Sequence, residues 1–196
     1  MSVAADPERQ DARQGRHLWM GAFLLGLFSF CIYALLIRYA VLYQDGQVNW
    51  SAFVTGNETS HFVLVQALTE GRTFKLDAFI PPVPLDLSTY GGHLYSNKPP
   101  GFALLIAPGY IIFRYVLLPL WSARPIPDFL PLFPAALGSL AVVLTYLLAL
   151  ELKLQRKSAA IGALVAGLAT IQVVYALSFM NNVASTTFLL LALWAA

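Results

Sequence analysis

The chain has 196 residues, of which 58% are hydrophobic and only 11% are charged. These charges are too few to cover the surface of a water-soluble domain of this length, which excludes an ordinary soluble protein. The formal net charge of +2 is close to neutral, and no basic, aromatic-rich surface for nucleic acid is present.

The apolar segments are long and continuous, which predicts membrane-spanning helices rather than the alternating strands of a barrel. The predicted fold is an all-α integral membrane protein with about four transmembrane helices. An outer loop with short juxtamembrane helices completes it. Cys31 lies inside the first apolar segment and, as the single cysteine, cannot form an intrachain disulfide.

Residues 1–17 are polar and carry charges of both signs, which predicts a disordered cytoplasmic tail. The first spanning helix is predicted from Leu18 to Tyr43, with Trp19 near the first membrane interface. Arg38 is expected to reach the far headgroups by snorkelling. A functional charge inside the membrane is the alternative for this residue.

Residues 44–99 are the least apolar part of the folded chain and are predicted to form an extracytoplasmic loop. A short amphipathic helix is expected over 57–70, and Gly71 is suited to end it. The expectation comes from four apolar or aromatic positions at helical spacing, namely His61, Leu64, Val65 and Leu68.

Residues 100–120 are apolar but are interrupted by Pro108. The basic stretch Lys153–Lys157 and the basic tail should both be cytoplasmic, so an even number of crossings must separate them. The predicted helices 18–43 and 129–150 already supply two crossings. Segment 100–120 is therefore predicted to be a re-entrant or interfacial helix on the outer face, broken near the proline. A full span is the alternative.

Two further apolar runs follow. One helix is predicted over 159–179, and the last run begins near Val183 and ends at Ala196. Since a span needs about 20 residues, this last run is short, and the chain is expected to be truncated or part of a longer protein. Asn181 and Asn182 are expected to end a helix, with the lining of a substrate site as the alternative.

Lys98 lies in the polar segment Gly91–Gly101, directly before Pro99 and Pro100. Pro99 disfavours helix at the lysine, and the two prolines stiffen the chain that follows. An ammonium at the membrane surface suits a lipid phosphate, because it is a compact cation with three donors. Anchoring of the next helix at the interface is the alternative.

Glu58 is the second candidate, at the predicted start of helix 57–70. A carboxylate there could accept a proton from an acceptor hydroxyl or hold a divalent cation. The segment Thr55–Glu58 also fits a capping box, in which the carboxylate satisfies a backbone amide at the helix start. His61 follows three residues later and can share the same helix face. No HExxH or CxxC pattern supports a metal site.

Two blocks carry a family resemblance: Asn57–Phe62, followed by Val65–Leu68 and Gly71, and Leu94–Gly101. The first is similar to an acidic motif at the start of the first outer-loop helix in the GT-C superfamily of membrane glycosyltransferases. The second resembles that superfamily's Tyr-Ser-x-Lys-Pro-Pro-Gly signature. The superfamily includes protein O-mannosyltransferases and the aminoarabinose transferases that act on lipid A.

The resemblance covers residues 18–196 and implies the N-terminal part of a membrane enzyme. That enzyme would transfer a sugar from a polyprenyl-phosphate donor to an acceptor on the outer face of the plasma or inner membrane, with its N-terminus in the cytoplasm. Glu58 would be the catalytic base or would orient the acceptor, and Lys98 would face the lipid phosphate. Further substrate contacts are expected from His61, Tyr95 and Asn182.

The chain departs from the family pattern in two places. Many relatives have two adjacent acids where this chain has Asn57 and Glu58, which leaves the assignment of the base open. A second acid is often found where this chain has Asn181 and Asn182. The alternative function is a non-enzymatic multi-pass membrane protein, such as a transporter half or an assembly subunit. Polar residues gather in the outer loop rather than at mid-membrane, which favours the enzyme.

Overall fold

The structure, a computed structural model, describes residues 7–37, 43–44, 47–48, 55–81, 85–117, 119 and 131–196. Its helices and strands, in chain order, are α1 (Pro7–Leu36), β1 (Tyr43–Gln44), β2 (Gln47–Val48), α2 (Gly56–Thr69), β3 (Leu87–Tyr90), β4 (His93–Ser96), α3 (Pro100–Ile112), the π-helix η2 (Phe113–Leu117), α5 (Leu132–Glu151), α6 (Arg156–Leu168), α7 (Ile171–Ala176) and α8 (Asn181–Ala195).

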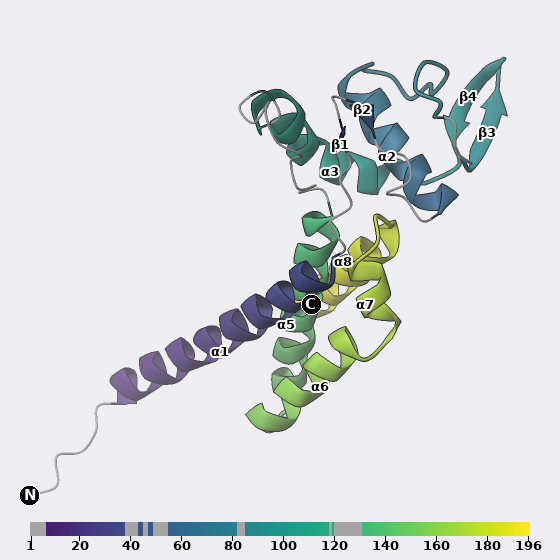
Figure 1. The fold of residues 1–196 in the computed structure, drawn as a ribbon. Coiled ribbons are helices and arrows are strands. Elements are labelled where there is room, and N and C mark those ends of the chain that lie inside the picture. Colours follow the sequence, from purple (N-terminus) through teal and green to yellow (C-terminus); the bar gives the residue numbers. More distant parts are fainter. Residues whose placement is uncertain are drawn as a thin grey trace, which may run out of the picture.

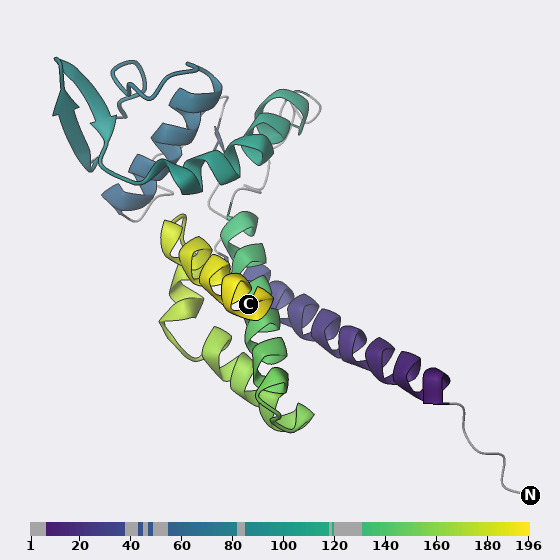
Figure 2. The same ribbon diagram turned by 180° about the vertical axis from the view of Figure 1, so that it is seen from behind.

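The mostly helical chain forms two groups of elements (Figures 1 and 2). In the first, here called the bundle, α5 lies in the middle and α1, α6, α7 and α8 pack on it. The second, here called the outer group, consists of α2, α3 and the β3–β4 hairpin beyond one end of α5. The two groups meet at the turn between α7 and α8, where the Phe179 ring contacts Phe62 and Phe102.

Helix α1 is longer at its start and shorter at its end than the sequence predicts. It begins at Pro7, inside the segment for which a disordered tail is predicted, and residues 1–6 lie outside the described part. Proline is well suited to a first helical position, and the residues that follow are mostly good helix formers. The predicted end at Tyr43 is wrong, because the helix ends at Leu36 and Tyr43 pairs with Val48 in a small antiparallel ladder.

Three helical stretches among the described residues are long and apolar enough to cross a membrane: Leu18–Leu36, Pro100–Leu117 and Leu132–Glu151. On the first of these, large apolar side chains such as Phe23 and Leu35 are exposed. A helix with an apolar exposed surface requires an apolar surrounding. The helix predicted over 129–150 is confirmed as α5, with its bounds shifted by a few residues.

Pro108 does not break the apolar segment 100–120, contrary to the prediction. Helix α3 continues through it to Ile112 and only then widens into the π-helix η2. A proline inside a helix removes one backbone hydrogen bond, and the helix can continue past it with a local bend. Figures 1 and 2 show α3 lying crosswise beyond the end of α5 rather than alongside it.

The single helix predicted over 159–179 is instead two helices, α6 and α7. Thr170 has an extended backbone (φ −126°, ψ −179°), and its hydroxyl accepts the N–H of Gln172. The same hydroxyl donates to the carbonyl of Ala166 in α6. A threonine in this conformation caps the start of a new helix, so it ends one apolar run and begins the next.

Helix α2 confirms the predicted short helix, but it is not amphipathic. Its residues from Glu58 to Ala67 are all buried, so the surrounding chain covers every side of the helix. The β3–β4 hairpin, which the sequence analysis does not predict, turns at Gly91 and Gly92 with φ values of +56° and +78°. Two residues of positive φ form the turn whose twist matches that of the strands, and glycine adopts them without strain.

Candidate functional site

Glu58 forms the predicted capping box at the start of α2. The Glu58 N–H donates to the Thr55 hydroxyl (3.3 Å), and the Thr55 N–H donates to Oε2 of Glu58 (3.2 Å). The residue is only 7% exposed. The capping role of this carboxylate is therefore confirmed, and it satisfies a backbone donor that the helix itself cannot.

The other carboxylate oxygen of Glu58 joins the outer group to the bundle. Oε1 accepts the buried N–H of Phe179 at 3.1 Å, across 121 positions of sequence. A buried charge needs such hydrogen bonds to offset its lost hydration. Glu58 thus holds the start of α2 against the turn between α7 and α8.

His61 is fully buried one turn further along α2, with its ring edge-on to Phe102 at a centroid distance of 5.2 Å. Neither ring nitrogen makes a well-formed hydrogen bond with the described residues, although the Asn181 side chain lies close enough to favour the protonated ring. Burial is the main cause that lowers the pKa of His61 to about 4; the Asn181 side chain opposes this shift, and the charge of Lys98 adds to it. The ring is therefore neutral at physiological pH.

Lys98 is paired with an acid that the sequence analysis did not single out as its partner. Its ammonium lies 2.7 Å from Oδ2 of Asp86, and the two side chains are 20% and 45% exposed. The Asp86 N–H donates to the hydroxyl of Ser60, which in turn donates to the Asp86 carbonyl. Ser60 precedes His61 on α2, so this link brings Lys98 to the helix that carries Glu58.

Tyr95 and Asn182 are linked less directly to the other candidate residues than Glu58, His61 and Lys98 are to one another. Tyr95 lies in β4 opposite Ser88, and no hydrogen bond among the described residues joins its side chain to the other candidates. Asn182 lies in the first turn of α8, so the two asparagines begin a helix rather than end one. It is its neighbour Asn181 that lies beside the ring of His61.

A second polar cluster lies on the exposed side of the hairpin. The Lys75 ammonium donates to Nε2 of His93 (2.9 Å), which assigns the ring proton to Nδ1, and Nδ1 lies 3.1 Å from Asp77 Oδ2. The N–H of Leu94 and the His93 ring hold the pKa of the Asp77 carboxyl below its usual value. The cluster fixes the hairpin to residues 75–77, where the Leu76 N–H also donates to the Leu94 carbonyl.

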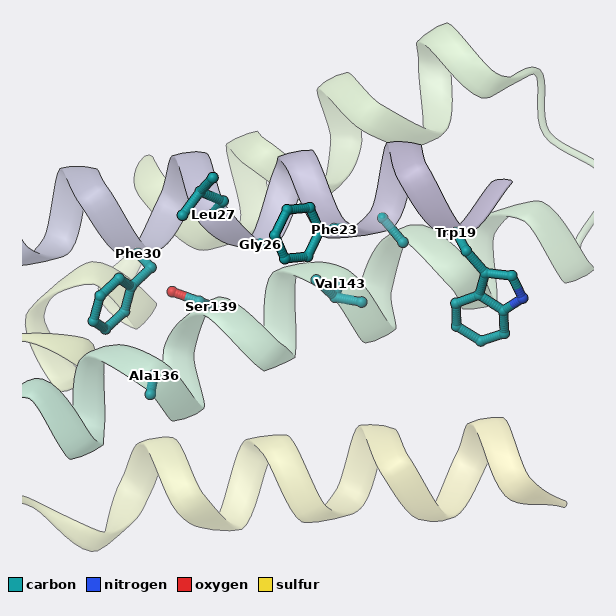
Figure 3. A pocket seen from close by; sticks show the side chains of 9 residues that line it. Trp19, Phe23, Gly26, Leu27, Phe30, Ala136, Ser139 and Val143 are labelled. Atoms are coloured by element: carbon teal, nitrogen blue, oxygen red, sulfur yellow. The ribbon is translucent and has the colours of Figure 1, made fainter. Parts of the chain in front are cut away.

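An apolar groove lies in the bundle, between α1 and α5 (Figure 3). It has a volume of about 430 Å³, and among the described residues that line it only Ser139 carries a hydroxyl. The Ser139 hydroxyl already donates to the Ala135 carbonyl at 2.8 Å. The described lining of the groove therefore offers mainly apolar contact.

Among the described residues, no three His, Cys, Asp or Glu side chains gather closely enough to hold a metal ion. The carboxylate of Glu58 is already used by Thr55 and Phe179. The divalent cation that the sequence left open at Glu58 therefore gains no set of donors from this part of the chain.

Asp86, Asn181 and Phe179 complete the site. Of these, only Asn181 is a candidate from the sequence, as the alternative in which the two asparagines line a substrate site. Asp86 had a local signal, since it is an acid of the same outer loop as Lys98. Phe179 had no such signal in the sequence, because it contributes a backbone N–H, which every residue except proline carries. No family model, no curated protein and no solved structure matches the chain.

Proposed function

We propose that this chain is a membrane glycosyltransferase, or part of one, that transfers a sugar from a polyprenyl-phosphate donor on the outer face of the membrane. One observation carries the proposal: a partly buried ammonium, Lys98, lies within electrostatic reach of the buried α2 face that presents Glu58 and His61. These are the charges that transfer from a phosphate-linked sugar requires.

The reaction requires the protein mainly to position the donor and the acceptor. A phosphate is a good leaving group, so the enzyme has to align the acceptor, receive its proton and stabilise the departing oxyanion. In this proposal Glu58 receives or orients the acceptor hydroxyl, and Lys98 faces the phosphate. Tyr95 and Asn182 would contact the substrate from the hairpin and from α8.

The ion pair of Lys98 with Asp86 is compatible with this role. The carboxylate is 45% exposed, and pairs of this kind contribute little to stability because water screens them. The donor is a phosphodiester with one negative charge, and its phosphate gains a second charge as the sugar leaves, so it can replace the carboxylate on the ammonium during transfer. Asp86 would then neutralise Lys98 only while no donor is bound.

The test is transfer by the full-length protein in membrane vesicles, with polyprenyl-phosphate mannose, glucose and aminoarabinose as donors. Lys98→Ala should lower the rate about 100-fold, because it removes a fixed charge from the leaving group. Lys75→Ala is the matched control: it removes a lysine of the same outer loop that is paired with His93. Its rate should stay close to that of the unchanged protein.

Glu58→Gln should also lower transfer, but here the thermal midpoint must be measured in parallel. A glutamine oxygen can replace only one of the two acceptors that hold Thr55 and Phe179. A rate loss at an unchanged midpoint supports a role in the reaction. Normal rates in both variants would remove Glu58 and Lys98 from the reaction. No transfer from any of the three donors would leave the non-enzymatic alternative.

A further inference from the structure

Two side chains on one face of α2 have buried polar atoms that make no well-formed hydrogen bond with the described residues. They are Oδ1 of Asn57 and the two ring nitrogens of His61. Residues four apart are neighbours on a helix surface, so the groups belong to one patch. A buried polar atom without a partner costs free energy, and such atoms in a folded protein call for an explanation.

Together, the side chains of Asn57 and His61 can both accept and donate hydrogen bonds. The amide oxygen of Asn57 is an acceptor, and a neutral histidine offers one lone pair and one N–H. The low pKa of His61 keeps the ring in this neutral form. A hydroxyl group, which also donates and accepts, complements such a set, whereas a carboxylate or phosphate would leave both acceptors without a donor.

The surroundings of the patch add an aromatic wall and a cation. Phe102 lies edge-on to the His61 ring, and the Lys98 charge acts on that ring from the side of the hairpin. Asn181 adds a further amide at the start of α8. Neutral hydrogen-bonding groups and an aromatic ring next to an ammonium match a group rich in hydroxyls that is attached to a phosphate.

We propose that Asn57 and His61 form a subsite that binds the hydroxyl groups of the donor sugar, next to the phosphate that Lys98 holds. The inference rests on the proposed function and adds to it the recognition of the sugar itself. Because the His61 ring is fully covered, the sugar can enter only when segments packed around this ring shift.

The test is competition between two lipids for the detergent-solubilised chain, observed by native mass spectrometry. Polyprenyl-phosphate mannose and polyprenyl-phosphate glucose are each compared with polyprenyl methyl phosphate, a sugar-free phosphodiester of the same charge. We expect at least one sugar-bearing lipid to bind about tenfold more tightly, since each added hydrogen bond contributes modestly. His61→Phe and Asn57→Leu should reduce this preference towards one and leave the binding of sugar-free lipid unchanged.

Two further variants separate recognition from folding. His61→Gln keeps a donor and an acceptor and should retain part of the preference, and Thr69→Val removes a hydroxyl at the far end of α2 and should retain all of it. The thermal midpoint of His61→Phe should be unchanged or higher, because the ring stays packed and unpartnered nitrogens are removed.

Three results would overturn the inference. Equal binding of sugar-bearing and sugar-free lipid by the unchanged chain would refute the subsite while leaving phosphate binding intact. If His61→Phe kept the preference for sugar-bearing lipid, other residues would have to recognise the sugar. Binding of neither lipid would remove the proposed function and the subsite together.

Discussion

Glu58 and His61 are three residues apart on α2, yet their polar atoms are used differently. Both oxygens of Glu58 accept hydrogen bonds, one within the capping box and one from Phe179. The nitrogens of His61 are also buried, but they make no well-formed hydrogen bond with the described residues. The acid therefore stabilises the fold as it stands, and the histidine costs stability unless a ligand uses it.

The cost of burying His61 should appear as a pH dependence of stability. Its pKa falls from 6.5 to about 4 in the folded chain, so between these values the unfolded chain binds more protons. The free energy of unfolding is therefore highest, as far as His61 is concerned, above pH 6.5, and it decreases as the pH falls towards 4. The loss should approach about 3 kcal/mol at the acid end.

The measurement is the thermal midpoint in detergent at pH 7.5 and at pH 4.5, for the unchanged chain and for His61→Phe. The variant should lose less stability on acidification, because phenylalanine binds no proton in either state. Carboxyl groups such as Asp77 titrate in both proteins, so the difference between the two isolates the histidine. The same acid shift in both would contradict the assignment.

At the scale of elements, glycines allow the bundle helices to approach closely. A Cβ atom on Gly167 would lie 2.3 Å from Cγ2 of Val142 in α5. The Gly167 carbonyl also accepts the buried hydroxyl of Tyr33 from α1, at 2.9 Å. Helices α1, α5 and α6 therefore meet at this one residue.

We expect Gly167→Ala to destabilise the chain by about 1–3 kcal/mol, because the added methyl forces α6 away from α5. Gly162→Ala is the matched control on the same helix, where a Cβ would meet nothing within 4 Å. It should be neutral or stabilise by about 0.5–1 kcal/mol, since alanine favours helix. Loss of helical circular dichroism on heating gives both midpoints, and equal midpoints would contradict the packing argument.

The presence of a helix could be predicted from the sequence more accurately than the residues at which it begins and ends. Apolar runs long enough to be helical are visible in the sequence, and α5 was placed within a few residues. The split between α6 and α7 was missed, because it depends on one hydroxyl of Thr170 inside an otherwise apolar run. The hairpin was missed because its strands are four residues long and too short for a clear alternation.

At the scale of the whole molecule, the outer group and the basic turn at Lys153–Lys157 lie at opposite ends of α5 (Figure 1). If α5 crosses the membrane, these two regions face opposite sides of it. The positive-inside rule then assigns the basic turn to the cytoplasm and the candidate site to the outer face. This assignment is the one that the proposed function requires.

Cysteine labelling tests this topology directly. The native thiol is removed by Cys31→Ala, and Thr89→Cys on the exposed strand β3 or Leu152→Cys, at a position that is 76% exposed, is then added. A membrane-impermeant maleimide added to intact cells should label the first variant. It should label the second only after permeabilisation. The reverse pattern would place Glu58 and Lys98 on the cytoplasmic side and would contradict sugar transfer at the outer face.

The amino-acid sequence by itself determined the apolar helices, the capped start of α2 and the stiff segment at Lys98. These features depend on residues within a turn or two of one another, and local preferences decide them. Only the tertiary structure decided that Lys98 pairs with Asp86, that Phe179 donates to Glu58 and that His61 is enclosed. Such contacts join segments far apart in the chain, and packing of the whole molecule is what selects them.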